Sequence, residues 1–172
     1  LYAVGYRPVR RDSAEVVDMW PTELFLGQPL ATLPLYLRGD VCVPIELASP
    51  GNKDRAEERR AFAAKCANYL YEGVSLIVLD VVTNRHANLH NEIVDLMRCG
   101  STFHFGREES LYAVGYRPIR RDSADVVDMW PTELFLGQPL PTLPLYLRGD
   151  VCVPVELEAA YNDASRRLRL TD

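Results

Sequence analysis

The sequence lacks the features that mark a membrane or exported protein. Its longest apolar run, Val74 to Val82, is interrupted by Ser75 and Asp80 and falls well short of the roughly 20 residues that cross a bilayer. The first 11 residues contain three arginines and no apolar stretch, so we expect no signal peptide. The sequence therefore predicts a protein with no membrane partner.

Paired cysteines and an excess of basic charge are also missing. The four cysteines form no C-x-x-C pair, and without a secretory signal a cytoplasmic location with reduced thiols is favoured. The net charge is −5, which argues against a generic basic nucleic-acid binder but leaves room for a local basic patch.

What is present is an ordinary globular balance. Of the 172 residues, 48% are hydrophobic and 25% are charged, which suits one domain over residues 1–172 and excludes a disordered tail or a fibre.

The most unusual feature is a long internal repeat. Residues 1–47 recur at 111–157 with only four differences in 47 positions. Ancient structural repeats usually keep an apolar pattern and not near-identity, so we interpret this one as a recent duplication, a recombined gene or an artificial assembly. Two units are also too few for a solenoid.

Each copy is rich in residues that favour β-strands. In the second copy we expect strands at 111–116 and 125–130, a proline-punctuated loop at 137–144 and a short strand at 151–157. A closing helix at 158–168 completes the segment 111–172.

The two copies continue differently, because the first leads into a Pro-Gly loop and the second into a helix. If the copies compete for one place in a sheet, register ambiguity or domain swapping follows. A homo-oligomer formed through the repeated β segment is therefore a candidate assembly.

The middle segment, 48–110, has the pattern of a βαβ unit followed by a short helix at 88–98. An apolar stripe predicts a helix at 54–72, followed by a nearly continuous apolar strand at 74–82. A right-handed crossover would make this strand parallel to the one at 41–47. We therefore expect an α/β or α+β fold with a β-rich flank built from the repeat.

Candidate chemistry lies where the strand at 41–47 ends. The carboxylate of Glu46 is followed by Ser49, Gly51, Asn52 and Lys53 at a predicted helix start. Backbone N–H groups there attract anions such as phosphate, and a neighbouring carboxylate can hold a divalent cation. The alternative is that Glu46 is a solvated strand residue, Ser49 and Asn52 are caps, and Lys53 lies on the surface.

Asp80 is a second candidate carboxylate. The predicted crossover puts it on a strand parallel to that of Glu46, where the two acids would share a metal. The alternative is a strand-end aspartate bonded to nearby backbone.

The histidines are weaker candidates. His86 and His90 are four residues apart, as two ligands on one helical face would be, but 84–88 has the composition of a loop and no H-E-x-x-H motif is present. We expect these histidines to lie exposed in a loop.

A family resemblance is carried by several ordered motifs. Residues 45–55 are Ile-Glu-Leu-Ala-Ser-Pro-Gly-Asn-Lys-Asp-Arg, 73–80 are Gly-Val-Ser-Leu-Ile-Val-Leu-Asp, 138–145 are Gln-Pro-Leu-Pro-Thr-Leu-Pro-Leu, and 153–161 are Val-Pro-Val-Glu-Leu-Glu-Ala-Ala-Tyr. Over about 45–168 the chain resembles the bacterial family named domain of unknown function 4058. That family in turn looks like a distant relative of the PD-(D/E)XK, or restriction-endonuclease-like, superfamily.

The resemblance implies a nuclease-like site of two acids and a lysine on adjacent strands. Glu46 matches the second acid, but Ala48 stands where the lysine should be, so Lys53 or Lys65 would have to serve instead. Asp40 lies upstream, where the first acid is expected, and Asp80 is the other possible metal ligand.

Two functions follow. The first is a nuclease or phosphodiesterase dependent on Mg²⁺ or Mn²⁺ and acting on DNA or RNA, or a degenerate form of one. The second is a non-catalytic binding or self-assembly module that uses the repeated β segment as a sheet edge. A nuclease needs a second acid near Glu46 and a lysine aimed at the same spot, whereas a binding module needs neither.

Overall fold

A computed structural model describes residues 2–11, 14–23, 33–37, 40–106, 111–147 and 151–169, with side chains from Pro44 onward. Its elements in chain order are β1 (Tyr2–Arg11), β2 (Ala14–Glu23), β3 (Leu33–Leu37), β4 (Asp40–Leu47), α1 (Pro50–Asp54), α2 (Ala56–Tyr71), β5 (Leu76–Asp80), α3 (Leu89–Leu96), η1 (Ser101–Phe103), β6 (Leu111–Arg121), β7 (Ala124–Leu134), β8 (Thr142–Tyr146), β9 (Cys152–Glu156) and α4 (Leu157–Arg167). The fold is mixed α/β, as expected from the sequence, and within the described ranges no helix is long and apolar enough to cross a bilayer.

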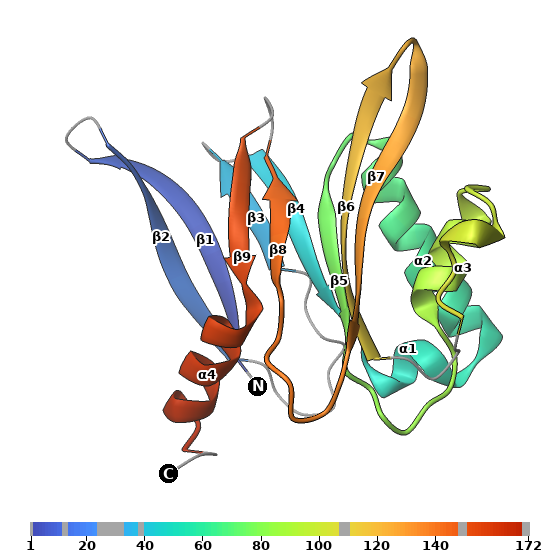
Figure 1. Cartoon of the computed structure of the whole chain (residues 1–172). Coiled ribbons are helices and arrows are strands. Elements are labelled where there is room, and N and C mark those ends of the chain that lie inside the picture. The colour runs from blue at the N-terminus through green and yellow to red at the C-terminus, as the bar shows by residue number, and fades with distance from the viewer. Residues whose placement is uncertain are drawn as a thin grey trace.

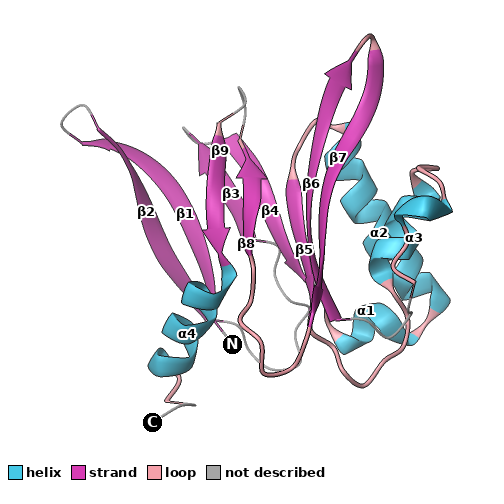
Figure 2. Ribbon diagram, viewed as in Figure 1, coloured by secondary structure: helices cyan, strands magenta, loops and turns pink. Residues whose placement is uncertain are grey.

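The central element is a five-stranded sheet in the order β3-β4-β5-β6-β7. Only β4 and β5 run parallel, and the other neighbours are antiparallel. Two further two-stranded sheets, β1-β2 and β8-β9, complete the β structure. Figure 1 shows the β6–β7 hairpin reaching beyond the other strands of the sheet, and Figure 2 shows α1, α2 and α3 gathered beside it, with α4 apart from them.

The parallel pair confirms the predicted crossover, although the helical segment differs in detail. The helix expected at 54–72 is α2, and a further short helix, α1, occupies part of the segment expected to be a Pro-Gly loop. Arg55 separates the two helices with extended angles of φ −125° and ψ 150°. Gly73 ends the segment with φ 76°, a conformation that glycine adopts without a Cβ clash. The short α1 brings Lys53 back over the ends of the strands.

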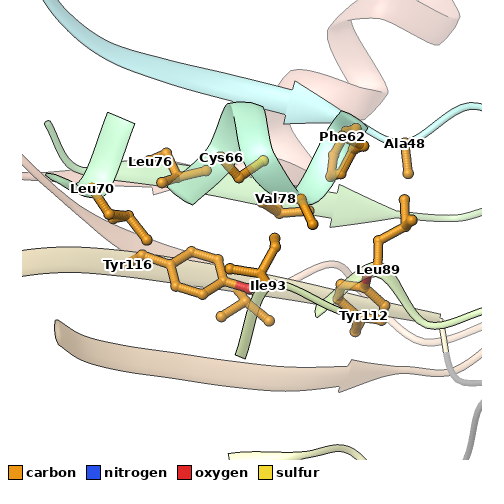
Figure 3. Close-up of a cluster of buried hydrophobic side chains, with 12 residues drawn as sticks. Ala48, Phe62, Cys66, Leu70, Leu76, Val78, Leu89, Ile93, Tyr112 and Tyr116 are labelled. Carbon is orange, nitrogen blue, oxygen red and sulfur yellow. The ribbon is translucent and has the colours of Figure 1, made fainter. Parts of the chain in front are cut away.

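The sheet is covered on both faces, which explains the apolar run of β5. One face packs against α2 and α3 through a cluster that Figure 3 shows: Ala48, Phe62, Cys66, Leu70, Leu76, Val78, Leu89, Ile93, Tyr112 and Tyr116. The opposite face packs against the β8–β9 hairpin and the start of α4, with Ile77, Ala113, Leu143, Leu145 and Leu157 buried. Successive residues along a strand of this sheet therefore point to opposite faces and belong to different cores.

One expected loop is partly a strand. Residues 137–144 contain three prolines, yet β8 begins at Thr142 and includes Pro144. Pro144 lies opposite Pro154 of β9 in this two-stranded sheet, and proline is tolerated at such edges because a missing N–H there costs no ladder hydrogen bond.

The first hairpins of the two copies of the repeat, β1–β2 and β6–β7, have the same register. Gly5 lies opposite Trp20 in β1–β2, and Gly115 lies opposite Trp130 in β6–β7. The second copy turns at Asp122 and Ser123 with positive φ at both residues, as a tight two-residue hairpin requires.

The copies nevertheless have different places in the fold. From the first copy, the second hairpin (β3–β4) joins the main sheet and the first hairpin (β1–β2) does not. From the second copy, the first hairpin (β6–β7) joins it and the second (β8–β9) packs on its face. Strand β5 is therefore bounded on each side by a different half of the same repeated sequence.

Candidate functional site

The predicted acids lie on two adjacent strands and on one face of the sheet. Glu46 of β4 is the register partner of Val78 in β5, and Asp80 follows Val78 by two residues, so both acids face the same side. Val78 belongs to the core under α2, which identifies that side as the helical one. The crossover has thus brought the acids together at the carboxyl ends of two parallel strands, a common place for ligands in α/β proteins.

Glu46 forms an ion pair with a lysine of α2. Lys65 Nζ lies 2.6 Å from Glu46 Oε2, and the Glu46 side chain is 3% exposed while that of Lys65 is 40% exposed. The lysine ammonium also lies 5.2 Å from the centre of the Phe62 ring on the preceding turn. Solvent therefore reaches this pair from the lysine side.

Asp80 forms a second, more deeply buried pair. Lys53 Nζ lies 2.9 Å from Asp80 Oδ2, with the two side chains 1% and 0% exposed. The other oxygen, Oδ1, accepts the Val82 N–H at 3.1 Å. The Tyr112 hydroxyl also hydrogen-bonds to Asp80, so this carboxylate has a cation and two neutral donors around it.

Ala48 explains why Lys53 can reach this place. Its backbone N–H donates to Leu79 O at 2.9 Å, which continues the β4–β5 register so that Ala48 lies beside Asp80. The Ala48 side chain is buried and small. A lysine at this position, as the nuclease pattern requires, would occupy the room beside Asp80 that the ammonium of Lys53 reaches from α1.

The predicted anion-binding residues are engaged in capping. Ser49 N and Ser49 Oγ each lie 2.8 Å from Asn52 Oδ1, and Asn52 N donates to Ser49 Oγ at 3.4 Å. This reciprocal arrangement is a capping box that starts α1. Gly51 is exposed beside it, so the capping alternative describes Ser49 and Asn52 in this structure.

The non-catalytic alternatives for Glu46, Lys53 and Asp80 agree with the structure only in part. The expectations of a solvated Glu46 and a surface Lys53 are wrong, because both residues are buried. Asp80 does bond to nearby backbone, but it is also paired with Lys53. Asp40 begins β4, six residues before Glu46, which puts it about 20 Å away along the strand, so the structure does not bring it to the site.

A polar network that the sequence analysis missed lies behind Asp80. His90 is buried in α3, which corrects the expectation of an exposed loop histidine. Its Nε2 lies 2.8 Å from Phe103 O and its Nδ1 lies 2.6 Å from the Tyr116 hydroxyl. A carbonyl only accepts, so Nε2 carries the proton and Nδ1 accepts from Tyr116.

The same network extends to Asp80 through a second tyrosine. The backbone N–H of His90 donates to the Tyr112 hydroxyl at 2.9 Å, and that hydroxyl is therefore free to donate to Asp80. Burial lowers the pKa of His90 and raises the pKa of Tyr112 and Tyr116 well above their usual value. The signal in the sequence was the spacing of Tyr112 and Tyr116, which places both on the helical face of one strand.

A separate polar hollow lies between α2 and α3. It is lined by Arg59, His86, Ala87, Asn88, Asn91, Glu92, Asp95 and His104. Its polar side chains contact one another, since Arg59 Nε lies 3.0 Å from Glu92 Oε1 and His104 Nε2 lies 2.9 Å from Asp95 Oδ1. Its chemistry points to no particular ligand.

No cluster of three or more histidine, cysteine or carboxylate side chains that would hold a metal ion occurs among the described residues. Comparison of the chain with protein-family models, with curated proteins and with solved structures finds no match. The resemblance to a nuclease-like family therefore stays a prediction.

Proposed function

We propose that this chain is a degenerate nuclease-like domain, in which two lysines neutralise the acids that a metal-dependent nuclease would use to bind its cation. The observation that carries the proposal is the pair of ion pairs, Glu46–Lys65 and Asp80–Lys53, on one face at the ends of β4 and β5. The placement of the acids agrees with a nuclease ancestry, and the placement of the lysines argues against hydrolysis.

The acids fit Mg²⁺ or Mn²⁺ poorly in this arrangement. Such cations take about six oxygen ligands, whereas Asp80 and Glu46 each already have an ammonium group at hydrogen-bond distance. A cation would have to displace Lys53 from a side-chain environment that is 1% exposed. Lys65 is the more exposed of the two lysines, so Glu46 is the acid that a cation would reach first.

The position of Lys53 gives a second argument. In a nuclease the lysine must contact the phosphate that is being cleaved, and a buried ammonium reaches no nucleic-acid backbone unless the crossover opens. Lys53 is instead part of the core between α1 and β5. Its role in this proposal is to compensate the charge of Asp80 and to hold α1 against the sheet.

Calorimetric titration of Mn²⁺ tests the proposal. We expect no saturable one-site binding to the wild-type protein or to Glu46→Gln, and no cleavage of DNA or RNA that depends on Glu46. Lys65→Met removes the ammonium and keeps a side chain of similar length, so we expect this variant to gain Mn²⁺ affinity. Saturable binding to the wild type that is lost in Glu46→Gln would restore the hydrolytic interpretation.

A second candidate function, self-association, is favoured by a different observation. Among the described strands, β1 pairs only with β2 and β9 pairs only with β8, although the corresponding strands β6 and β4 both pair with β5. Unpaired strand edges of this kind are sites of edge-to-edge association. Light scattering over a range of protein concentration tests whether the chain associates.

A further inference from the structure

The unpaired edge of β1 has the sequence of a strand that pairs with β5. We propose that the β1–β2 hairpin of one molecule docks on strand β5 of a second copy of this chain, in the place of that copy's own β6–β7 hairpin. The inference rests on the self-association proposal and adds the partner strand and the register of the contact.

The first argument is that the two hairpins are interchangeable in sequence. Strand β6 pairs with β5 in this structure, and β1 would pair with it after docking. The equivalent residues 2–11 and 112–121 differ at one position only, where β1 has Val9 and β6 has Ile119. That position lies outside the β5 contact, because β5 pairs with β6 between Tyr112 and Tyr116. The contacting pentapeptides, Tyr-Ala-Val-Gly-Tyr in both copies, are identical.

The second argument is that the hairpins have the same backbone register. Tyr2 lies opposite Glu23 as Tyr112 lies opposite Glu133, and the same offset of 110 holds to the ends of both hairpins. A β5 strand that meets β1 antiparallel would therefore find the same alternation of residues as on β6. In that register Val78 would pair with Val4 instead of Val114.

The third argument concerns the contacts that β6 makes beyond β5. Tyr112 and Tyr116 hold the α3 network through His90, and Tyr2 and Tyr6 supply the same residue types at the equivalent positions. The core beneath α2 and α3 can thus be completed by either copy.

The fourth argument is that docking leaves the first copy's other contacts in place. Strand β1 lies against β3 as β6 lies against β8, and β4 pairs with the β5 of its own chain. One first copy can therefore bind two β5 strands, its own through β4 and a foreign one through β1. The contact is head-to-tail, so it either closes into a ring, of which a reciprocal dimer is the smallest, or extends into an open chain.

The exchange replaces one β5–β6 pairing with one β5–β1 pairing of the same composition. The number and type of contacts therefore change little. Whether the monomer or the associated form predominates depends on the protein concentration and on how strongly β6 binds β5. Changes that weaken β6 should shift the chain to the associated form, and the same changes in β1 should not.

Matched variants test this asymmetry in the full chain. Val114 is buried in the core under α2, so Val114→Asp places a charge where β6 docks. By light scattering and thermal unfolding we expect Val114→Asp to associate at concentrations where the wild type is monomeric, and to unfold cooperatively. Val4→Asp should match the wild type, and the double variant should neither associate nor unfold cooperatively.

A folded monomeric Val114→Asp would overturn the proposal, as would a Val114→Asp that is as unfolded as the double variant. A disulfide experiment on intact hairpins removes any dependence on that variant. Leu79 pairs with Ala113 in β5–β6, so its partner after exchange is Ala3. Chains carrying Leu79→Cys are mixed with chains carrying Ala3→Cys, concentrated and oxidised.

The background for this experiment replaces Cys42, Cys99 and Cys152 by serine and keeps Cys66, which is fully buried with a raised thiol pKa. We expect a disulfide-linked dimer of the two mixed chains, and none when Ala14→Cys, at the far end of the hairpin, replaces Ala3→Cys. Association without the link between residues 79 and 3 would leave self-association in place and refute the exchange.

Discussion

Removal of the Lys53 ammonium is the sharpest test of the buried pair. Lys53→Met keeps most of the aliphatic volume and deletes the charge that compensates Asp80. The remaining partners of Asp80 are the Val82 N–H at 3.1 Å and the Tyr112 hydroxyl. Because Asp80 is 0% exposed, water cannot replace the missing cation.

The expected cost follows from this burial. Loss of one partner from a buried ion pair destabilises a protein by about 3–5 kcal/mol, because the other charge stays buried and uncompensated. For a chain of this size each kcal/mol lowers Tm by about 2–4 °C, so Lys53→Met should lower Tm by roughly 6–20 °C. Lys65→Met removes a lysine that is 40% exposed, so solvent can reach the place of its ammonium and partly compensate Glu46, and this variant should cost less than Lys53→Met.

Urea unfolding of Lys53→Met, Lys65→Met and the double variant Lys53→Met/Asp80→Leu measures these differences. The double variant removes both charges, and we expect it to recover much of the stability that Lys53→Met loses. Equal costs for Lys53→Met and Lys65→Met would refute the assignment of Lys53 as the buried structural cation. So would a double variant that is less stable than Lys53→Met alone.

Two further predictions concern the surroundings of the site. His90 has a lowered pKa because it is buried, so the unfolded state takes up a proton that the folded state resists. We therefore expect the urea midpoint to fall as pH drops below about 6.5. The fall should be smaller in His90→Asn, and an equal fall in that variant would contradict this assignment. A Cβ at Gly115 would lie 3.2 Å from the Pro144 carbonyl oxygen, whereas one at Gly106 meets nothing within 4 Å. Gly115→Ala should therefore cost about 1–3 kcal/mol in thermal unfolding, and a cost no larger than that of Gly106→Ala would contradict the close approach of β8 to β6.

Much of the candidate site could be predicted from the sequence. The strand–helix–strand order places Glu46 and Asp80 on adjacent parallel strands, because a right-handed crossover leaves few alternatives. The sequence did not tell which lysine meets which acid. Lys53 and Lys65 differ in their distance from Glu46 along the chain, but their pairing depends on the break between α1 and α2 at Arg55, which turns Lys53 toward Asp80.

The buried histidine shows a different limit. His90 lies on a short helix whose inward face is otherwise apolar, and a polar residue in such a position is compatible with burial only if partners exist elsewhere in the fold. Those partners, Tyr116 and the Phe103 carbonyl, come from distant parts of the chain. No local sequence pattern around His90 predicts these two partners.

The repeat separates the two kinds of information most clearly. The sequence by itself determined that the first hairpins of the two copies have the same register, because turn residues and side-chain alternation are local properties that both copies share. The second hairpins differ in register, since Tyr36 pairs with Val41 after a shift in β3–β4 whereas Tyr146 pairs with Cys152 in β8–β9. Which hairpin of each copy joins the main sheet was decided only in the tertiary structure. Nearly identical segments have the same intrinsic preferences, so the choice comes from their connections to the rest of the chain. Strand β4 leads into the crossover and therefore lies beside β5 on one edge. The β6–β7 hairpin follows α3 and pairs with the other edge of β5.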